Sequence, residues 1–140
     1  MEKLVCLIWR HSAEERAAFN ARLLAHLPPA LATAGASGLR INLEDEIAAK
    51  GAHLRQSRGD VQHDAVVQFW LPSANALFRV EVDAALTAQG ARWCGWVVAE
   101  STIIANSAHS AVAGKRTAGW SQMAFLVRPE RLSHEQWLAA

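Results

Sequence analysis

The sequence lacks the features of secreted, membrane-spanning and nucleic-acid-binding proteins. Its 140 residues carry 14 Lys and Arg against 13 Asp and Glu, so the net charge of +1 gives no general field to attract nucleic acid or an anionic membrane. No apolar run approaches about 18 residues without a charge, and we therefore expect no membrane span. The first residues do not form a charged segment followed by an apolar one, so no signal peptide is recognisable. We expect a cytoplasmic protein with neither a nucleic-acid nor a membrane partner.

Cysteine is scarce, tyrosine is absent, and no metal-ligand pattern is present. The two cysteines, Cys6 and Cys94, both lie in apolar, strand-like runs, which favours buried free thiols over a disulfide. No two histidines have the close spacing that a zinc or iron site needs. The Gly-x-Ser-x-Gly segment of many serine hydrolases is also missing. We therefore expect neither a metal nor another cofactor.

Apolar residues are abundant and follow strand and helix patterns. They make up 51% of the chain against 19% charged residues, as in a compact globular domain. Runs of continuous or alternating apolar residues predict strands, in chain order at 3–9, 39–43, 64–71 and 91–105. A long loop is expected at 44–60, with a short helical turn near Ile47. A helix is expected over 74–89, although this segment also alternates like a strand.

An earlier helix is expected directly after the first strand. It should begin at Ser12, where Glu15 three residues later completes a capping box. Its apolar face is formed by Phe19, Leu23, His26 and Leu27. Pro28-Pro29 then interrupts or ends the helix.

The order of these elements predicts an α+β protein with a ferredoxin-like βαββαβ fold. In that fold two helices cover one face of an antiparallel sheet. The predicted strands carry apolar side chains on both faces, so the face without helices also needs a cover. A covalent repeat or a second copy would supply this cover, sheet against sheet, and we expect a homodimer or higher homo-oligomer.

The end of the chain resembles its beginning. Gln122–Arg128 repeats the apolar run that ends in arginine at Leu4–Arg10, and the segment from Ser133 repeats the helix start at Ser12. The expected organisation is a ferredoxin-like unit at 1–105, a linker at 106–118, and the start of a second repeat, with a strand and a partial helix, at 119–140. The sequence leaves open whether the repeat is truncated, and whether the strand expected at 119–128 pairs within the chain or with a partner.

Taken together, these segments resemble the EthD-type members of the dimeric α/β-barrel superfamily. The matching segments are Leu7-Ile8-Trp9-Arg10, Ser12-Ala13-Glu14-Glu15, His26-Leu27-Pro28, Phe69-Trp70 and Val97-Val98-Ala99-Glu100. The restart at Gly119-Trp120-Ser121-Gln122 is similar to the tandem members, which carry two units in one chain. The resemblance implies a dimeric α/β barrel with a pocket, between sheet and helices, for a small apolar or aromatic molecule.

His26 is the candidate catalytic residue, because its position near the end of the helix should point it toward the sheet. A neutral imidazole there would suit a general acid or base, and the alternative is a partly buried structural histidine. His53 and His63 flank the long loop and are expected to be exposed.

Candidate substrate-binding residues lie in or beside the predicted strands, and they are Trp9, Arg10, His11, Trp70 and Trp96. Trp70 and Trp96 share strand faces with the polar Gln68 and Glu100, which indicates a cavity or a wet interface. Arg10 would either pair with Glu100 or bind an anionic substrate group. His11 would face either the site or solvent.

Two functions follow from these expectations. The first is an EthD-like enzyme that acts on an apolar or aromatic substrate by metal-free acid/base chemistry, as a cyclase, isomerase or cofactor-free oxygenase. The second is a non-catalytic dimeric ligand-binding or scaffold protein.

Overall fold

The computed structural model describes residues 1–56, 62–100, 111–118, 123–125 and 128–139. The chain divides into two compact units, Met1–Ile103 and Ile104–Ala140. The first unit contains the sheet and the longer helices. The described part of the second contains one short helix.

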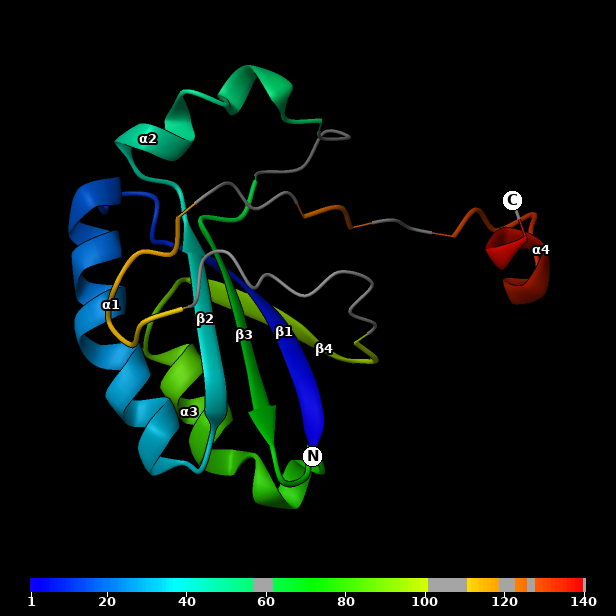
Figure 1. Ribbon diagram of the computed structural model, residues 1–140, viewed down its shortest axis with the longest axis horizontal. Coiled ribbons are helices and arrows are strands. Elements are labelled where there is room, and N and C mark those ends of the chain that lie inside the picture. The colour runs from blue at the N-terminus through cyan, green and yellow to red at the C-terminus, as the bar shows by residue number, and fades with distance from the viewer. Residues whose placement is uncertain (57–61, 101–110, 119–122, 126–127, 140) are drawn as a thin grey trace. The chain divides into compact units, whose positions relative to one another are not determined.

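The first unit is built on a four-stranded antiparallel sheet (Figure 1). Its strands are β1 (Glu2–Trp9), β2 (Ser37–Leu43), β3 (Ala65–Leu71) and β4 (Arg92–Val98). They lie in the order β2-β3-β1-β4, and each neighbouring pair is antiparallel. This arrangement is compatible with a ferredoxin-like fold and confirms the expected mixed α+β class.

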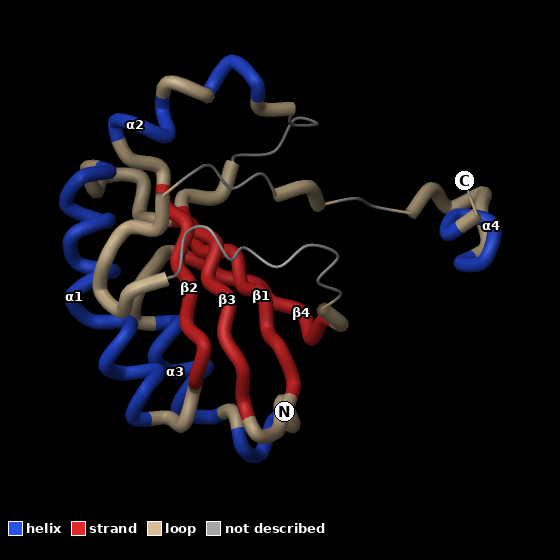
Figure 2. Tube along the Cα trace, in the orientation of Figure 1, coloured by secondary structure: helices blue, strands red, loops and turns tan. Residues whose placement is uncertain are grey.

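Two helices, α1 (Arg16–Thr33) and α3 (Val80–Thr87), lie on one face of this sheet (Figure 2). The core between helices and sheet contains Leu4, Cys6 and Ile8 of β1, and every second residue of β3 points into it as well. From α1 it contains Phe19, Leu23, Leu27 and Leu31, which are four residues apart and fully buried. Among the described residues, no helix is long and apolar enough to cross a membrane.

Helix α1 differs from its prediction at both ends. It begins after Glu15, which makes no capping hydrogen bond with its side chain, so the capping box expected at Ser12 is wrong. It also continues through Pro28 and Pro29 to Thr33. The prolines remove two hydrogen bonds to carbonyl groups one turn earlier, at Leu24 and Ala25. Both of these residues are exposed to water, while buried leucines on either side of the prolines hold the helix to the sheet.

The segment between β3 and β4 forms two short helices instead of the single long one predicted. The 3-10 helix η2 (Ala76–Phe78) begins where the Asn75 side chain accepts a hydrogen bond from the Leu77 backbone, at 3.1 Å, and α3 follows it. The predicted loop at 44–60 contains the expected turn near Ile47, as α2 (Glu46–Ala49), and a 3-10 turn, η1 (Ala52–Leu54). Strand β4 ends at Val98, and 101–105 lie outside the described residues.

The second unit contains a short helix where the start of a helix was expected. Helix α4 (His134–Leu138) begins with a capping box formed by Ser133 and Gln136. Much of the strand predicted at 119–128 lies outside the described residues, and the described part, 123–125 and 128, forms no strand.

Candidate functional site

The face of the sheet opposite α1 and α3 carries the tryptophans that the sequence singled out. This distal face is defined by Lys3, Val5, Leu7 and Trp9 of β1, which alternate with the core residues, and by the side chains beside them on β2, β3 and β4. In the strand register, Trp70 lies beside Lys3 and Trp96 beside Val5. The structure therefore brings Trp9, Trp70 and Trp96 onto the same face.

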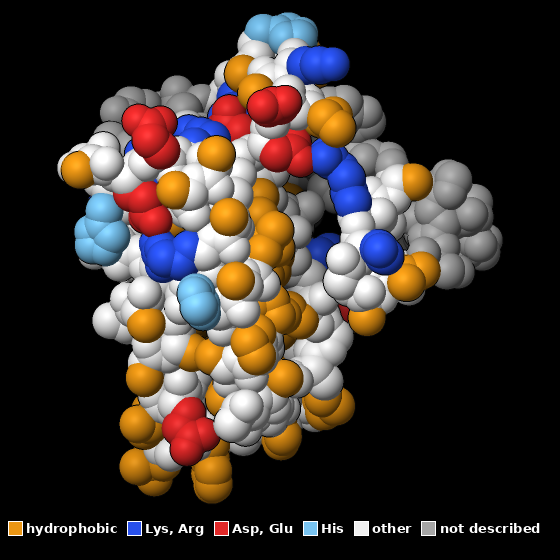
Figure 3. Space-filling view, turned by 90° about the vertical axis from the view of Figure 1, so that its left-hand side faces the viewer, with side chains coloured by type: hydrophobic (Ala, Val, Ile, Leu, Met, Phe, Trp, Pro, Cys, Tyr) orange, Lys and Arg blue, Asp and Glu red, His pale blue; other side chains and the backbone are white. Residues whose placement is uncertain are grey.

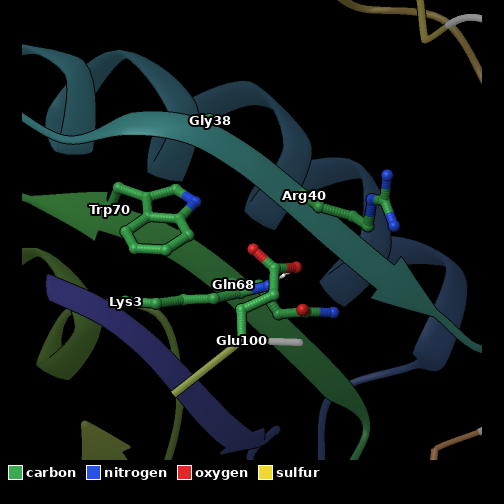
Figure 4. Close-up of a pocket in the computed structure, with 6 residues that line it drawn as sticks. All are labelled: Lys3, Gly38, Arg40, Gln68, Trp70 and Glu100. Carbon is green, nitrogen blue, oxygen red and sulfur yellow. Dashed lines mark hydrogen bonds and ion pairs between the residues drawn. The ribbon is translucent and has the colours of Figure 1, made fainter. Parts of the chain in front are cut away.

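Around Trp70 the distal face contains a hollow of about 150 Å³ (Figure 4). The residues that line this Trp70 hollow are Lys3, Gly38, Arg40, Gln68, Trp70 and Glu100. They come from β1, β2, β3 and the segment after β4, so all four strands contribute to the position of the hollow. The hollow lies on the side of the sheet away from the core.

Gly38 shapes the wall that β2 forms. The strand has a register shift between Ser37 and Arg40, and Gly38 takes a left-handed backbone conformation there, with φ of +60°. A Cβ atom on Gly38 would lie 2.9 Å from Cδ1 of Trp70, so the indole occupies space that any side chain would fill. Glycine is needed here both for the backbone conformation and for the close contact with the indole.

The charges in the Trp70 hollow are only partly paired. Lys3 donates to Glu100 over 2.5 Å, and its ammonium nitrogen is 5.8 Å from the centre of the Trp70 ring. Arg40 forms no ion pair or hydrogen bond through its side chain with another described residue. The opposite charges of Lys3 and Glu100 cancel. The guanidinium of Arg40 therefore gives the described residues that line the hollow a net charge of +1.

Trp9 lies at the other end of the distal face, between a cation and a histidine. The guanidinium of Arg92 is 4.2 Å from the Trp9 ring centre, and the His63 ring meets Trp9 edge to face at 6.2 Å. His63 is half-buried, which corrects the prediction that it is exposed. Burial lowers the pKa of His63 below its usual value of 6.5, a shift that the neighbouring Asp64 carboxylate opposes.

Because His63 is half-buried in the folded protein, we expect the protein to lose stability on mild acidification. His63 binds a proton readily in the unfolded chain below pH 6.5 but resists it in the folded chain, so the unfolded state binds more protons in that range. The free energy of unfolding should therefore fall as the pH drops from 6.5 through the folded-state pKa. Urea titrations at several pH values should show this slope, and His63→Gln should flatten it.

Two carboxylates provide an internal control for the pH titration. Hydrogen bonds from arginine lower the pKa values of Glu14 and Glu44 below 4.5, so their contributions are lost only at pH values under 4.5. A pH profile of His63→Gln that matches the unmodified protein between pH 6.5 and 5 would contradict the assignment.

Arg10 is held in a structural ion pair at the end of β1. Its Nε atom is 3.1 Å from Oδ1 of Asp64, and its backbone N–H donates to Oδ2 of the same carboxylate at 3.0 Å. Its guanidinium also donates to the Glu14 carbonyl oxygen. The expected pairing with Glu100 is therefore wrong, because the antiparallel register of β1 and β3, in which Ile8 pairs with Ala65, brings Asp64 to the end of β1 next to Arg10. His11 is exposed in the loop that follows.

His26 lies exposed on α1, so the expectation that it points toward the sheet is wrong. The buried residues of α1 follow steps of four, and each residue turns the helix by about 100°. That rotation places His26 well outside the stripe that contains Leu27. On this side of the molecule, histidine, acidic and basic side chains are interspersed with apolar ones (Figure 3). Neither the Trp70 hollow nor a hollow of about 310 Å³ beside β4 is lined by His26, whose catalytic role stays a prediction.

Both cysteines are free thiols, as expected. Cys6 lies in the core, and burial raises its pKa to about 12, so the thiol is protonated at neutral pH. Cys94 lies on the distal face, where burial also raises its pKa. In the described part of the chain, no group of three or more histidine, cysteine or carboxylate side chains is placed to hold a metal ion.

Three residues of the Trp70 hollow were missed in the sequence: Lys3, Gly38 and Arg40. Arg40 lies between Leu39 and Ile41, and this alternation already placed it on the face away from the core. Lys3 begins the strand predicted at 3–9, and nothing around it in the sequence indicates a binding role. No local signal in the sequence identifies the contact of Gly38 with Trp70, because the two residues are 32 positions apart.

Comparison with known proteins identifies no relative. No protein-family model matches the chain, and no curated protein matches its sequence. The resemblance to EthD-type proteins therefore depends on short motifs and on the order of the elements, and membership of that family stays a prediction.

Proposed function

We propose that the chain is a small-molecule-binding protein of the EthD type. Two copies would pack distal face against distal face as a dimeric α/β barrel, with the ligand held at the Trp70 hollow. The observation that carries this proposal is the presence of Trp9, Trp70 and Trp96 on the sheet face that α1 and α3 leave uncovered.

The composition of the distal face supports packing against a second sheet. Val5, at its centre, is flanked by Gln68 on β3 and Trp96 on β4. Trp96 is 49% exposed, so a large apolar side chain is accessible at this place. Tryptophan is enriched in protein interfaces, because it buries a large area and keeps one polar group for a hydrogen bond.

The other face of the sheet has a hollow of about 310 Å³ beside β4, lined by Leu4, Arg79 and Trp93 among others, but this face is filled beneath α1. Phe19, Leu23 and Phe69 are fully buried there and fill the layer between helices and strands. We therefore place the ligand site on the distal face, where the tryptophans gather, and not beneath α1. The hollow beside β4 is the alternative between sheet and helices, where the family resemblance had put the pocket.

Binding is better supported than catalysis. The enzyme proposal, a cyclase, isomerase or cofactor-free oxygenase, needs a titratable group close to the ligand, and His26 is exposed on α1 instead. His63 is neutral at pH 7 because its pKa is lowered, but it lies beside Trp9, at the other end of the distal face from the Trp70 hollow. It could therefore act as a general base only on a ligand that also reaches Trp9. His63→Gln with intact ligand binding and lost turnover would support the enzyme.

The dimer is tested by placing a charge at the centre of the distal face. Val5→Lys should weaken self-association by about 100-fold or more, because an unpaired charge buried between two sheets costs several kcal/mol. Size-exclusion chromatography with light scattering should show twice the 15.2 kDa chain mass for the unmodified protein at micromolar concentration. The same experiment should show a monomer for Val5→Lys.

Leu24→Lys is the matched control. Leu24 is 52% exposed on α1, and its replacement adds the same charge outside the proposed interface. This variant should remain a dimer, and circular dichroism should show that both variants are folded. A monomeric unmodified protein, or equal dissociation by the two substitutions, would refute the proposal.

A further inference from the structure

The Trp70 hollow is rich in hydrogen-bond donors that lack an acceptor. The guanidinium of Arg40, the amide of Gln68 and the indole N–H of Trp70 all line it, and none donates to another described residue. Gln68 and Trp70 are partly buried, where polar groups are normally paired by protein, water or ligand, whereas Arg40 is exposed to solvent. A set of donors without acceptors favours a ligand that accepts hydrogen bonds.

The charge of the hollow favours an anion with a single negative charge. Lys3 is neutralised by Glu100 at 2.5 Å, which leaves Arg40 as the one uncompensated charge among the described residues that line the hollow. The planar guanidinium of arginine matches a carboxylate, because its parallel N–H groups can bind both oxygens.

The Trp70 indole supplies a fixed aromatic wall. Its Cδ1 atom lies where a side chain on Gly38 would stand, so the glycine allows the ring to lie against β2. The register shift of the same strand falls between Ser37 and Arg40, and Gly38 lies within it. Such bulges change the direction of the side chains that follow, and here Arg40 follows directly.

Glu100 places a carboxylate in the hollow from within the chain. Figure 4 shows its side chain reaching over the strands toward Lys3. The Glu100 side chain is 40% exposed, and Lys3 is its single ion-pair partner among the described residues. An external carboxylate would compete with this side chain for the positive charges.

We infer that the Trp70 hollow binds a small aromatic carboxylate, with its ring against Trp70 and its carboxylate at Arg40. This inference rests on the proposed function and names the class of ligand. A volume of about 150 Å³ suits a single six-membered ring, since an engineered apolar cavity of about that size in another protein holds benzene. Glu100, held by Lys3, adds a negative charge to the same hollow and so opposes the binding of a second carboxylate.

Benzoate and benzamide form the test pair, because they have the same ring and nearly the same size but differ in charge. The full chain contains six tryptophans, so six indole N–H resonances report binding in a nitrogen–proton correlation spectrum, and Trp70→Phe assigns one of them. Benzoate should shift the Trp70 resonance with about tenfold higher affinity than benzamide, the gain typical of a charge-assisted hydrogen bond.

Three variants test which residue causes the preference for benzoate over benzamide. Arg40→Gln should remove it, leaving benzoate and benzamide with similar affinity. Lys50→Gln, which removes one positive charge from an exposed residue beside α2, should retain it. Glu100→Gln should tighten benzoate binding by roughly threefold to tenfold, because it removes a competing charge, whereas a purely structural Lys3–Glu100 pair would affect stability alone.

The outcomes separate this inference from the proposed function. Equal shifts of the Trp70 resonance by both compounds would overturn the aromatic carboxylate and leave an apolar binding site. A benzoate preference that survives Arg40→Gln, or that Lys50→Gln removes equally, would overturn the assignment to Arg40. Absence of any indole shift with either compound would overturn both the inference and the proposed ligand site.

Discussion

Replacing Asp64 with asparagine is expected to lower the free energy of unfolding by about 3 kcal/mol, the lower end of the cost of breaking a buried ion pair. The Asp64 side chain is 9% exposed, and its Oδ1 atom lies 3.1 Å from Arg10 Nε and 3.2 Å from an Arg16 nitrogen. Arg16 also contacts Glu44 at 2.8 Å. Asp64 therefore links the end of β1, the start of α1 and the segment before α2. Urea denaturation followed by circular dichroism measures the loss.

Asp83→Asn provides the matched control for this prediction. Asp83 pairs with Arg79 one helical turn away, at 2.9 Å, and both side chains are about a third exposed. Surface pairs of this kind contribute about 0.5 kcal/mol or less. Equal losses for the two substitutions would show that the Asp64 network does not hold these elements together.

Gly90→Ala is expected to destabilise the protein by about 3 kcal/mol, at the upper end of the usual cost of overpacking. A Cβ atom at this position would lie 2.5 Å from the Trp9 carbonyl oxygen and 2.7 Å from Cγ2 of Ile8. The Trp9 carbonyl cannot move freely, because it accepts the Ala91 backbone N–H at 2.8 Å. Relief of the clash would separate β1 from the turn that leads into β4. Thermal unfolding should show a large fall in Tm.

Gly35→Ala separates the steric effect from the effect of losing a glycine. Gly35 has a φ of +83° but no atom within 4 Å of the added Cβ, so its substitution should cost only about 1–2 kcal/mol of backbone strain. If Gly90→Ala proved the milder of the two, the close approach of Gly90 to Trp9 would be contradicted.

The positions of the strands were predictable because they depend on the order of residues along the chain. Lys3–Trp9 was predicted and Glu2–Trp9 is observed, and the 64–71 prediction differs from β3 by one residue. Runs of apolar side chains identify buried strands without knowledge of their neighbours. The alternation in β3 also placed Gln68 and Trp70 on the same face.

The errors arose where tertiary contacts overrule local preference. Pro28 and Pro29 should end a helix in isolation, yet the burial of Leu27 and Leu31 carries α1 past them. His26 was placed on the buried face by its spacing from Phe19, but the buried stripe turns away from it. The partner of Arg10 depended on strand pairing, which the sequence does not specify.

The measurement that tests the central claim most directly is a filtered nuclear Overhauser experiment on a mixture of isotopically labelled and unlabelled chains. It detects contacts between copies and ignores contacts within a chain, including any with residues 104–140. The account predicts intermolecular contacts at Val5, Trp96 and Val98 on the distal face. Contacts confined to the outer side of α1, or none at all in a folded sample, would contradict the pairing of the two sheets.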